Sequence, residues 1–196
     1  MQTNDILSEK EKMIAGLAYY PTKDDNLSND RLKCKILCQK YNTLSYDDTS
    51  KDEILNQIIG KMGKILGVEP CFWCDYGYNI EIGDGFYSNH NLTILDCAKV
   101  KFGKNVLIGP NCSFYTAIHP INAKERNSLL EYAKPIAIED NVWIGGSVTV
   151  LPDVTIGKNS VIGAGSVVTK NIPKNVIAVG NPCKVIKTID EGEEKS

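Results

Sequence analysis

Aliphatic residues recur every six positions in the C-terminal half of the chain. Phe102, Ile108 and Phe114 share one register with a later set, whereas Ile82, Ile94 and Val100 form a second set displaced by two residues. The later set is Ile138, Ile144, Val150, Ile156, Ile162 and Val168. A period of six belongs neither to an amphipathic helix nor to an alternating strand. It predicts very short strands separated by turns, which bury their apolar side chains only by stacking on equivalent units.

Glycine directly follows the aliphatic position in many of these units. We expect it there because the backbone must turn tightly without a Cβ clash. The glycines concerned are Gly83, Gly103, Gly109, Gly145, Gly157 and Gly163. Three units complete one triangular turn, and successive turns stack at about 4.8 Å, the ordinary strand spacing. The pattern predicts an all-β parallel β-helix over residues 67–189, with a column of Ile and Val inside.

Residues 1–66 instead show helical spacing. Ser8 with Glu11, and Ser50 with Glu53, match the capping-box pattern that starts helices. An apolar stripe at helical intervals predicts one helix through Ile54, Leu55, Ile58, Ile59, Met62, Ile65 and Leu66. A middle helix is expected to start at Asn29 or Asp30. This region reads as a small helical N-terminal cap that packs on the coil.

The sixfold register breaks after His119 and resumes in phase at Ile136. Residues 120–135 therefore form an excursion loop from a continuous coil, and long loops on rigid scaffolds commonly carry function. After Pro182, the string KVIKTID is expected to form a short closing helix or strand. The charged residues 190–196 are expected to be disordered.

Composition limits the classes of function. With 22 Lys+Arg and 24 Asp+Glu, the net charge of -2 offers no attraction for nucleic acid or an anionic membrane. No apolar run predicts a membrane span or a secretory signal, so we expect a cytoplasmic protein with its seven Cys reduced. Cys71 and Cys74 form a lone CxxC pair without the context of a zinc ribbon or a thioredoxin, and we interpret them as structural.

Several strings together resemble one known family. The hexapeptide repeats, the helical cap, a loop that begins at a His-Pro, and the strings CDYGYNIEIG, NVWIGGSV, VIGAGSVVTK and AVGNPCKVI resemble the maltose/galactoside O-acetyltransferases. The resemblance implies a left-handed β-helix, which assembles as a homotrimer with active sites between adjacent subunits. It also implies direct acetyl transfer from acetyl-CoA to a sugar hydroxyl, through a tetrahedral intermediate and without a metal.

The resemblance also assigns candidate residues on the acceptor side. His119 matches the catalytic histidine, and a neutral imidazole suits the removal of a hydroxyl proton. Asn89 matches a position close to both ligands, and Asp75 and Asp96 match substrate-binding positions. Some relatives carry a second acid after the position of Asp96, where this chain has Cys97. The other histidine, His90, lies in a rung of the coil and is interpreted as a turn residue.

Other acceptor-side positions remain open. The family draws an acid from the cap, and Tyr20, Asp24 or Asp25 could occupy that place. Glu131 and Tyr132 either line the acceptor pocket or pack the loop. Trp143 is expected to pack on the coil surface, near the site.

The cofactor-side candidates follow the same resemblance. Gly146 stands where many relatives have Ser, so a backbone N–H remains for the oxyanion but the hydroxyl does not. Ala164, Thr169 and Lys170 match contacts to the pantetheine arm. Three lysines are expected to bind the phosphates of coenzyme A: Lys170, Lys184 and Lys187. Some relatives have Arg at the positions of Lys184 and Lys187, so this chain keeps the charge there but loses the bidentate geometry.

Three alternatives compete with sugar acetylation. Carbonic anhydrases of the γ type share the trimeric β-helix, but they need three zinc-binding histidines, and this chain has two in total. A non-catalytic hexapeptide scaffold would lack the loop or its histidine. Xenobiotic or amino-sugar acceptors are the neighbouring alternatives within the acetyltransferases, because loop pockets change acceptor readily.

Overall fold

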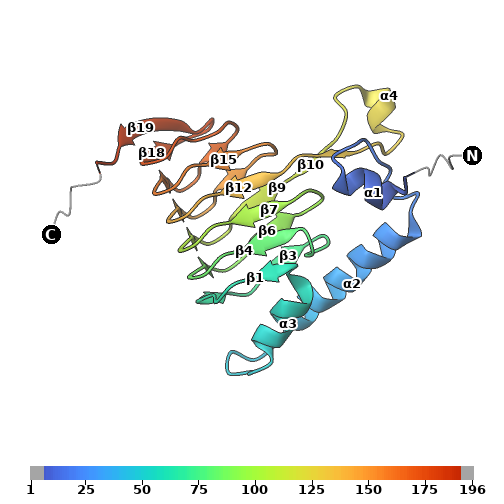
Figure 1. The fold of residues 1–196 in the computed structure, drawn as a ribbon, viewed down its shortest axis with the longest axis horizontal. Helices are drawn as coiled ribbons and strands as arrows, with labels where there is room; N and C mark the ends of the chain where they lie inside the picture. Colours follow the sequence, from blue (N-terminus) through green and yellow to red (C-terminus); the bar gives the residue numbers. More distant parts are fainter. Residues whose placement is uncertain (1–6, 191–196) are drawn as a thin grey trace, which may run out of the picture.

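Short parallel strands wind into a coil whose successive turns stack into three sheets (Figure 1). The computed structural model describes residues 7–190. The first sheet contains β1 (Lys61–Met62), β4 (Ile80–Ile82), β7 (Val100–Phe102), β12 (Ile136–Ile138) and β15 (Thr155–Ile156). The second contains β2 (Gly67–Val68), β5 (Tyr87–Ser88), β8 (Leu107–Ile108), β13 (Trp143–Ile144), β16 (Val161–Ile162), β18 (Val176–Val179) and the antiparallel β19 (Lys184–Thr188). The third contains β3 (Phe72–Cys74), β6 (Leu92–Leu95), β9 (Ser113–Tyr115), β14 (Thr149–Val150) and β17 (Val167–Val168).

The register of these strands confirms the predicted period. Ile138 pairs with Ile156, 18 residues further on, which is three repeats of six. Phe102 pairs with Ile138, 36 residues on, because the excursion loop intervenes. Earlier turns are two residues longer, since Ile82 pairs with Phe102, 20 residues on. The longer turns explain the displacement between the two aliphatic sets.

The interior of the coil is a continuous apolar column. Phe102, Ile138 and Ile156 occupy successive levels of it and are at most 1 % exposed. The rings of Phe86 and Phe114 each meet that of Phe102 edge to face, with centroids 5.2 and 5.1 Å apart. Burial of such side chains stabilises the fold by roughly 1.5–3 kcal/mol each, so the coil is held chiefly by this column.

The corners of the coil differ from the sequence-based expectation. Among the non-glycine residues, left-handed backbone falls mainly on asparagine, including Asn105, Asn141 and Asn159 with φ of 54 to 61°. Their side-chain amides form a ladder, in which Asn105 Nδ2 donates to Asn141 Oδ1 (3.1 Å) and Asn141 Nδ2 to Asn159 Oδ1 (3.0 Å). The expected role of the glycines after the aliphatic positions is therefore corrected. A Cβ on Gly103, for example, would lie 2.8 Å from the backbone of the next turn, so close stacking excludes the side chain.

Three helices form the cap below and beside the coil: α1 (Glu9–Ile14), α2 (Asp25–Asn42) and α3 (Lys51–Ile58). The Ser8–Glu11 capping box is confirmed, whereas Ser50 precedes α3 without capping it. The prediction of one helix through Leu66 is wrong, because α3 ends at Ile58 and β1 of the coil begins three residues later.

The expected start of the middle helix is also wrong. α2 begins at Asp25, because the carboxylate of Asp24 caps it by accepting from Asn26 N at 2.8 Å.

The C-terminal end closes with a strand rather than a helix. β19 pairs antiparallel with β18 at the end of the second sheet. Of the predicted charged tail, residues 191–196 lie outside the described part of the chain. Among residues 7–190, no helix has the length and apolar character needed to cross a membrane.

Candidate active site

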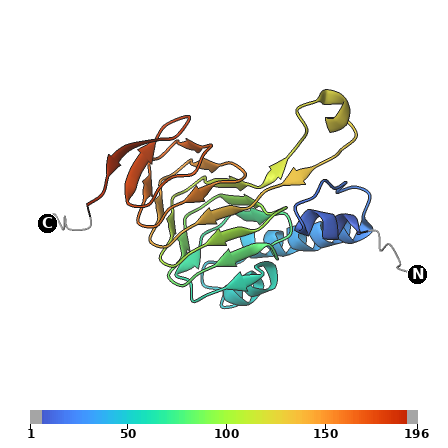
Figure 2. The ribbon, with the colours of Figure 1, turned by 45° about the horizontal axis from the view of Figure 1, so that its top comes forward.

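The excursion loop is an ordered arm that projects from the coil beside the cap (Figure 2). β10 (Ala117–Ile118) and β11 (Tyr132–Ala133) form an antiparallel ladder at its root, and α4 (Ala123–Arg126) lies at its tip. The carboxamide of Asn122 caps α4, and Arg126 Nη1 donates to the carbonyl oxygens of Pro120 (3.1 Å) and Ile121 (2.9 Å). His119 directly follows β10 and is exposed. Its imidazole has no hydrogen-bond partner within residues 7–190, so both ring nitrogens are open to a ligand.

The cap is joined to the root of this arm by Tyr19 and Glu131. Tyr19 N donates to Glu131 O at 3.0 Å, and Glu131 N donates to Tyr19 O at 2.9 Å. The Tyr19 hydroxyl also donates to the Glu131 carboxylate, and both side chains are buried. Glu131 therefore faces inward and Tyr132 lies on the exposed side of the arm, which answers the choice left open by the sequence: Glu131 packs the junction.

A second polar group lies where the third sheet turns toward the first. Asp96 follows β6 and is fully buried, and its Oδ1 accepts from Asp75 N (3.0 Å) and Tyr76 N (2.9 Å). The Cys97 thiol lies 3.9 Å from Asp75 Oδ2. Asp75 is half-buried and can reach a ligand. The buried Asp96 instead fixes the backbone that presents Asp75.

Burial changes the protonation of these acids. Burial is the main cause that raises the pKa of Asp96 to about 6, and the negative charge of the nearby Asp75 acts in the same direction. The hydrogen bonds from the backbone N–H groups act in the opposite direction and lower the pKa. Burial also raises the pKa of Asp75, which Arg31 and Lys35 oppose. Asp96 Oδ2 and Tyr78 Oη are buried with no hydrogen-bond partner among the described residues. A buried polar atom without a hydrogen bond normally lowers the free energy of unfolding by about 1–3 kcal/mol. This corner therefore holds two polar atoms that are able to accept or donate a further hydrogen bond.

The cap residues left open by the sequence take different roles. Asp24 is used as the α2 cap, and its Oδ2 also accepts from Lys10 N at 3.1 Å. The Tyr20 ring lies 3.4 Å from Lys23 Nζ, and Asp25 is exposed at the start of α2. Tyr19, which sequence reasoning missed, is a buried cap side chain that reaches Glu131 of the arm. Its only sequence signal is that Tyr19 and Tyr20 are adjacent and must point in different directions.

The cofactor-side candidates lie at a different corner, between the second and third sheets. Asn89 follows β5, Gly146 follows β13 and Ala164 follows β16. A Cβ on Gly109 would lie 2.6 Å from Gly146 N, and one on Gly145 would lie 2.7 Å from Ala164 N, so these positions stack in one column. Within residues 7–190 the Gly146 N–H has no acceptor. The corner thus presents uncovered backbone with little side-chain bulk.

The remaining candidates lie in the last turns of the coil. Thr169 and Lys170 follow β17 and are exposed. Lys184 and Lys187 belong to β19, whose side chains are all exposed. These lysines therefore form an open basic edge at the C-terminal end of the coil.

Other sequence-based interpretations can be compared with the structure. His90 Nδ1 is hydrogen bonded to the Pro70 carbonyl, which agrees with a structural turn residue. Trp143 is 55 % exposed on the outer face of the second sheet, beside Leu107, which is 43 % exposed. This apolar outer face contrasts with the charged outer face of the first sheet, on which Glu81 pairs with Lys99 at 2.7 Å.

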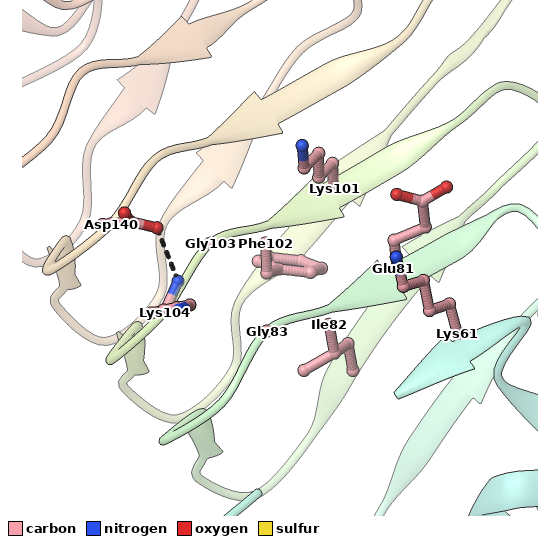
Figure 3. A pocket seen from close by; sticks show the side chains of 9 residues that line it. All are labelled: Lys61, Glu81, Ile82, Gly83, Lys101, Phe102, Gly103, Lys104 and Asp140. Atoms are coloured by element: carbon pink, nitrogen blue, oxygen red, sulfur yellow. Dashed lines mark hydrogen bonds between the residues drawn. The ribbon is translucent and has the colours of Figure 1, made fainter. Parts of the chain in front are cut away.

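A hollow on the charged face lies away from all predicted site residues (Figure 3). Its floor is formed by Ile82 and Phe102, and Lys61 and Lys101 line its side. At one end Lys104 N donates to the Asp140 carboxylate at 2.7 Å. The hollow is lined neither by a histidine nor by the unpaired backbone N–H of Gly146, so it is not the candidate active site.

Metal-binding side chains converge at one place in residues 7–190, and that place contains no histidine. The group is Cys34, Cys38 and Cys74, all buried. Cys71, the other half of the CxxC pair, is exposed and is not part of the group. The two cysteines of this motif therefore have different environments.

The cap and the coil each match a known family model, and the whole chain is similar to a known protein. A family model described as the maltose acetyltransferase hexapeptide capping motif matches residues 12–63, and one described as bacterial transferase hexapeptide (six repeats) matches residues 135–170. A putative acetyltransferase of Saccharomyces cerevisiae is 52 % identical over 92 % of this chain and 93 % of its own length.

Two solved structures are similar over nearly the whole chain. A maltose O-acetyltransferase from Clostridium difficile 630 is 50 % identical, with a TM-score of 0.92 over 94 % of this chain and 99 % of its own. A galactoside acetyltransferase in complex with coenzyme A is 40 % identical, with a TM-score of 0.90 over 95 % of this chain and 93 % of its own.

Proposed function

The chain belongs to the maltose/galactoside O-acetyltransferase family of left-handed β-helix, hexapeptide-repeat enzymes, and from this premise we propose that it transfers an acetyl group from acetyl-CoA to a sugar hydroxyl. It is an acetyltransferase that uses acetyl-CoA as co-substrate. The sugar acceptor and the roles of individual residues are the proposal. The observation that carries it is His119, exposed at the root of an ordered arm with both ring nitrogens open.

The neutral imidazole of His119 takes the proton of the acceptor hydroxyl while the oxygen attacks the thioester carbonyl carbon. A positioned general base of this kind contributes roughly 10²- to 10⁴-fold to the rate. The carbon–sulfur bond of the tetrahedral intermediate then breaks, and the imidazolium returns the proton to the coenzyme A thiolate. The half-buried Asp75 binds an acceptor hydroxyl, and Asp96 positions it through the Asp75 and Tyr76 N–H groups.

The oxyanion of the intermediate needs a hydrogen-bond donor. The unpaired N–H of Gly146 supports a backbone donor in this role. The small side chains beside it leave space for an extended pantetheine arm, with Asn89 and Ala164 along its course and Thr169 near its end. Lys170, Lys184 and Lys187 bind the phosphates of coenzyme A from the exposed basic edge.

The two halves of this site lie at two different corners of one coil. Asp75 follows β3 of the third sheet, and His119 follows β10, the short strand that comes after β9 of that sheet. Asn89 and Gly146 instead follow strands of the second sheet. We infer that a neighbouring copy supplies the missing half, as in a homotrimer with sites between subunits. The exposed apolar pair Leu107 and Trp143 on the second sheet supports burial of that face against another copy.

One acceptor panel tests this function. The purified chain is incubated with acetyl-CoA and with maltose, glucosides, galactosides, amino sugars or simple xenobiotic amines, and thiol release is followed. We expect release with the sugars and acetyl esters in the products. If thiol is released only with amines and the products are amides, the acceptor is an amine and not a sugar. If no acceptor causes thiol release, the proposal is contradicted.

A further inference from the structure

Three buried thiols meet where the cap packs on the coil. Cys34 and Cys38 lie one helical turn apart on α2 and face Cys74 at the end of β3. The Cys34 and Cys74 sulfurs are 3.4 Å apart, and those of Cys38 and Cys74 are 3.8 Å apart. None of the three residues is more than 4 % exposed. The proposed acetyl transfer uses none of these thiols.

The thiols form one hydrogen-bonded unit rather than three separate packing residues. The Cys74 sulfur is within hydrogen-bond distance of both other sulfurs, and in each contact either sulfur can be the donor. A soft cation that replaces the thiol protons would bind all three sulfurs.

The spacing suits a single ion with three sulfur ligands. Metal–thiolate bonds are about 2.3 Å long, which places three sulfurs around one ion in a plane roughly 4 Å apart. The observed separations of 3.4 and 3.8 Å would need to grow by roughly 0.6 and 0.2 Å. Arg31 and Lys35 act on the neighbouring Asp75, whereas the charged side chain outside the cluster that acts on Cys34 and Cys74 is the buried Asp96.

The ligand set decides which ion fits. Structural zinc takes four ligands, but the converging group in the described chain offers three and includes no histidine or carboxylate. Thiolate-only sets select soft ions, of which cuprous copper is the principal biological monovalent case. We propose that Cys34, Cys38 and Cys74 bind one Cu⁺ ion as a three-thiolate site between α2 and β3. Binding forms three copper–sulfur bonds, and the three thiols release their protons to solvent.

The test uses the reduced, metal-free full chain under anaerobic conditions. Cu⁺ is titrated in competition with bicinchoninate, and we expect one ion retained per chain. The Cys34→Ser/Cys38→Ser variant should lose this ion, whereas Cys71→Ser/Cys183→Ser, which removes two thiols outside the cluster, should keep it. Loss in the Cys71/Cys183 variant, or equal retention in both, would overturn the proposal. Excess Zn²⁺ should not displace the copper, and displacement would point to a zinc site instead.

Three readouts on the unmutated chain guard against a variant that fails to fold. X-ray absorption should find three sulfur neighbours around copper, and an oxygen or nitrogen neighbour would contradict the site. Cu⁺ should also raise the melting temperature, because the ion binds only where α2 is docked on β3. Retention should weaken as the pH falls, since protons compete for the thiolates. An unchanged melting temperature in saturating Cu⁺ would equally refute the proposal.

Discussion

The Tyr19 hydroxyl donates a hydrogen bond to the Glu131 carboxylate across the junction between the cap and the arm. The two residues are 112 positions apart in sequence, and their backbones are paired as well. Because His119 directly follows β10 and Glu131 directly precedes β11, the two paired strands at the root of the arm, we expect this junction to position the imidazole. The helical cap therefore acts on the site through a buried contact rather than through an exposed acid.

Removal of the Tyr19 hydroxyl tests that junction. Tyr19→Phe leaves the buried Glu131 carboxylate without its donor, so the free energy of unfolding should fall by about 1–3 kcal/mol. We also expect lower kcat/KM, because the arm loses its anchor. Urea denaturation and thiol release measure the two effects. Tyr46→Phe, at an exposed tyrosine of the cap, is the matched control and should change neither. Equal effects of both substitutions would remove the special role of Tyr19.

Substitution of the proposed base should abolish most turnover. His119→Ala should lower kcat by roughly 10²- to 10⁴-fold with little change in the melting temperature, because the side chain is exposed and makes no internal hydrogen bond. His90→Ala controls for the loss of an imidazole and should retain most of kcat. Single-turnover thiol release distinguishes the chemical step from product release. Full activity of His119→Ala would eliminate the proposed mechanism.

The buried carboxyl of Asp96 predicts a specific pH dependence of stability. Its pKa rises from 3.8 to about 6 on folding. The folded state therefore binds more protons between these values, and the free energy of unfolding falls as the pH rises through them, by roughly 3 kcal/mol. Asp96→Asn should flatten this part of the profile, since a carboxamide oxygen still accepts from the two N–H groups.

Urea midpoints at pH 4, 5, 6 and 7 measure the slope. Asp140→Asn is the control, because that exposed carboxylate also accepts a backbone N–H and its loss should leave the slope unchanged. A slope that persists in Asp96→Asn would assign the dependence to another group.

A charge on the apolar outer face should prevent assembly. Leu107→Glu places a carboxylate where we propose that a second copy packs, and the desolvation of an unpaired charge is costly. Light scattering should show trimers for the unmutated chain and monomers for this variant, with activity lost in parallel. Lys101→Glu, on the charged first sheet, should remain trimeric. An active monomer would show that one chain holds a complete site.

The sequence by itself determined the coil. The sixfold recurrence of aliphatic residues is a local property that only a stacked coil can bury, and the structure reproduces it as pairs such as Ile138 and Ile156. The Ser8–Glu11 box was readable for the same reason, since its partners lie three residues apart. The end of α3 was not readable. Met62 and Ile65 satisfy helical spacing, and only their packing against later turns of the coil makes this segment part of the first turn.

Contacts between distant segments were decided by the tertiary structure alone. The pairing of Tyr19 with Glu131, the burial of Asp96 and the meeting of Cys74 with Cys34 each bring together residues from different elements. No local period encodes such meetings, because they depend on how a helix or an arm is docked on the coil. The repeat therefore determines the scaffold, whereas the docking of the cap and the arm determines which polar groups are buried and which remain for chemistry.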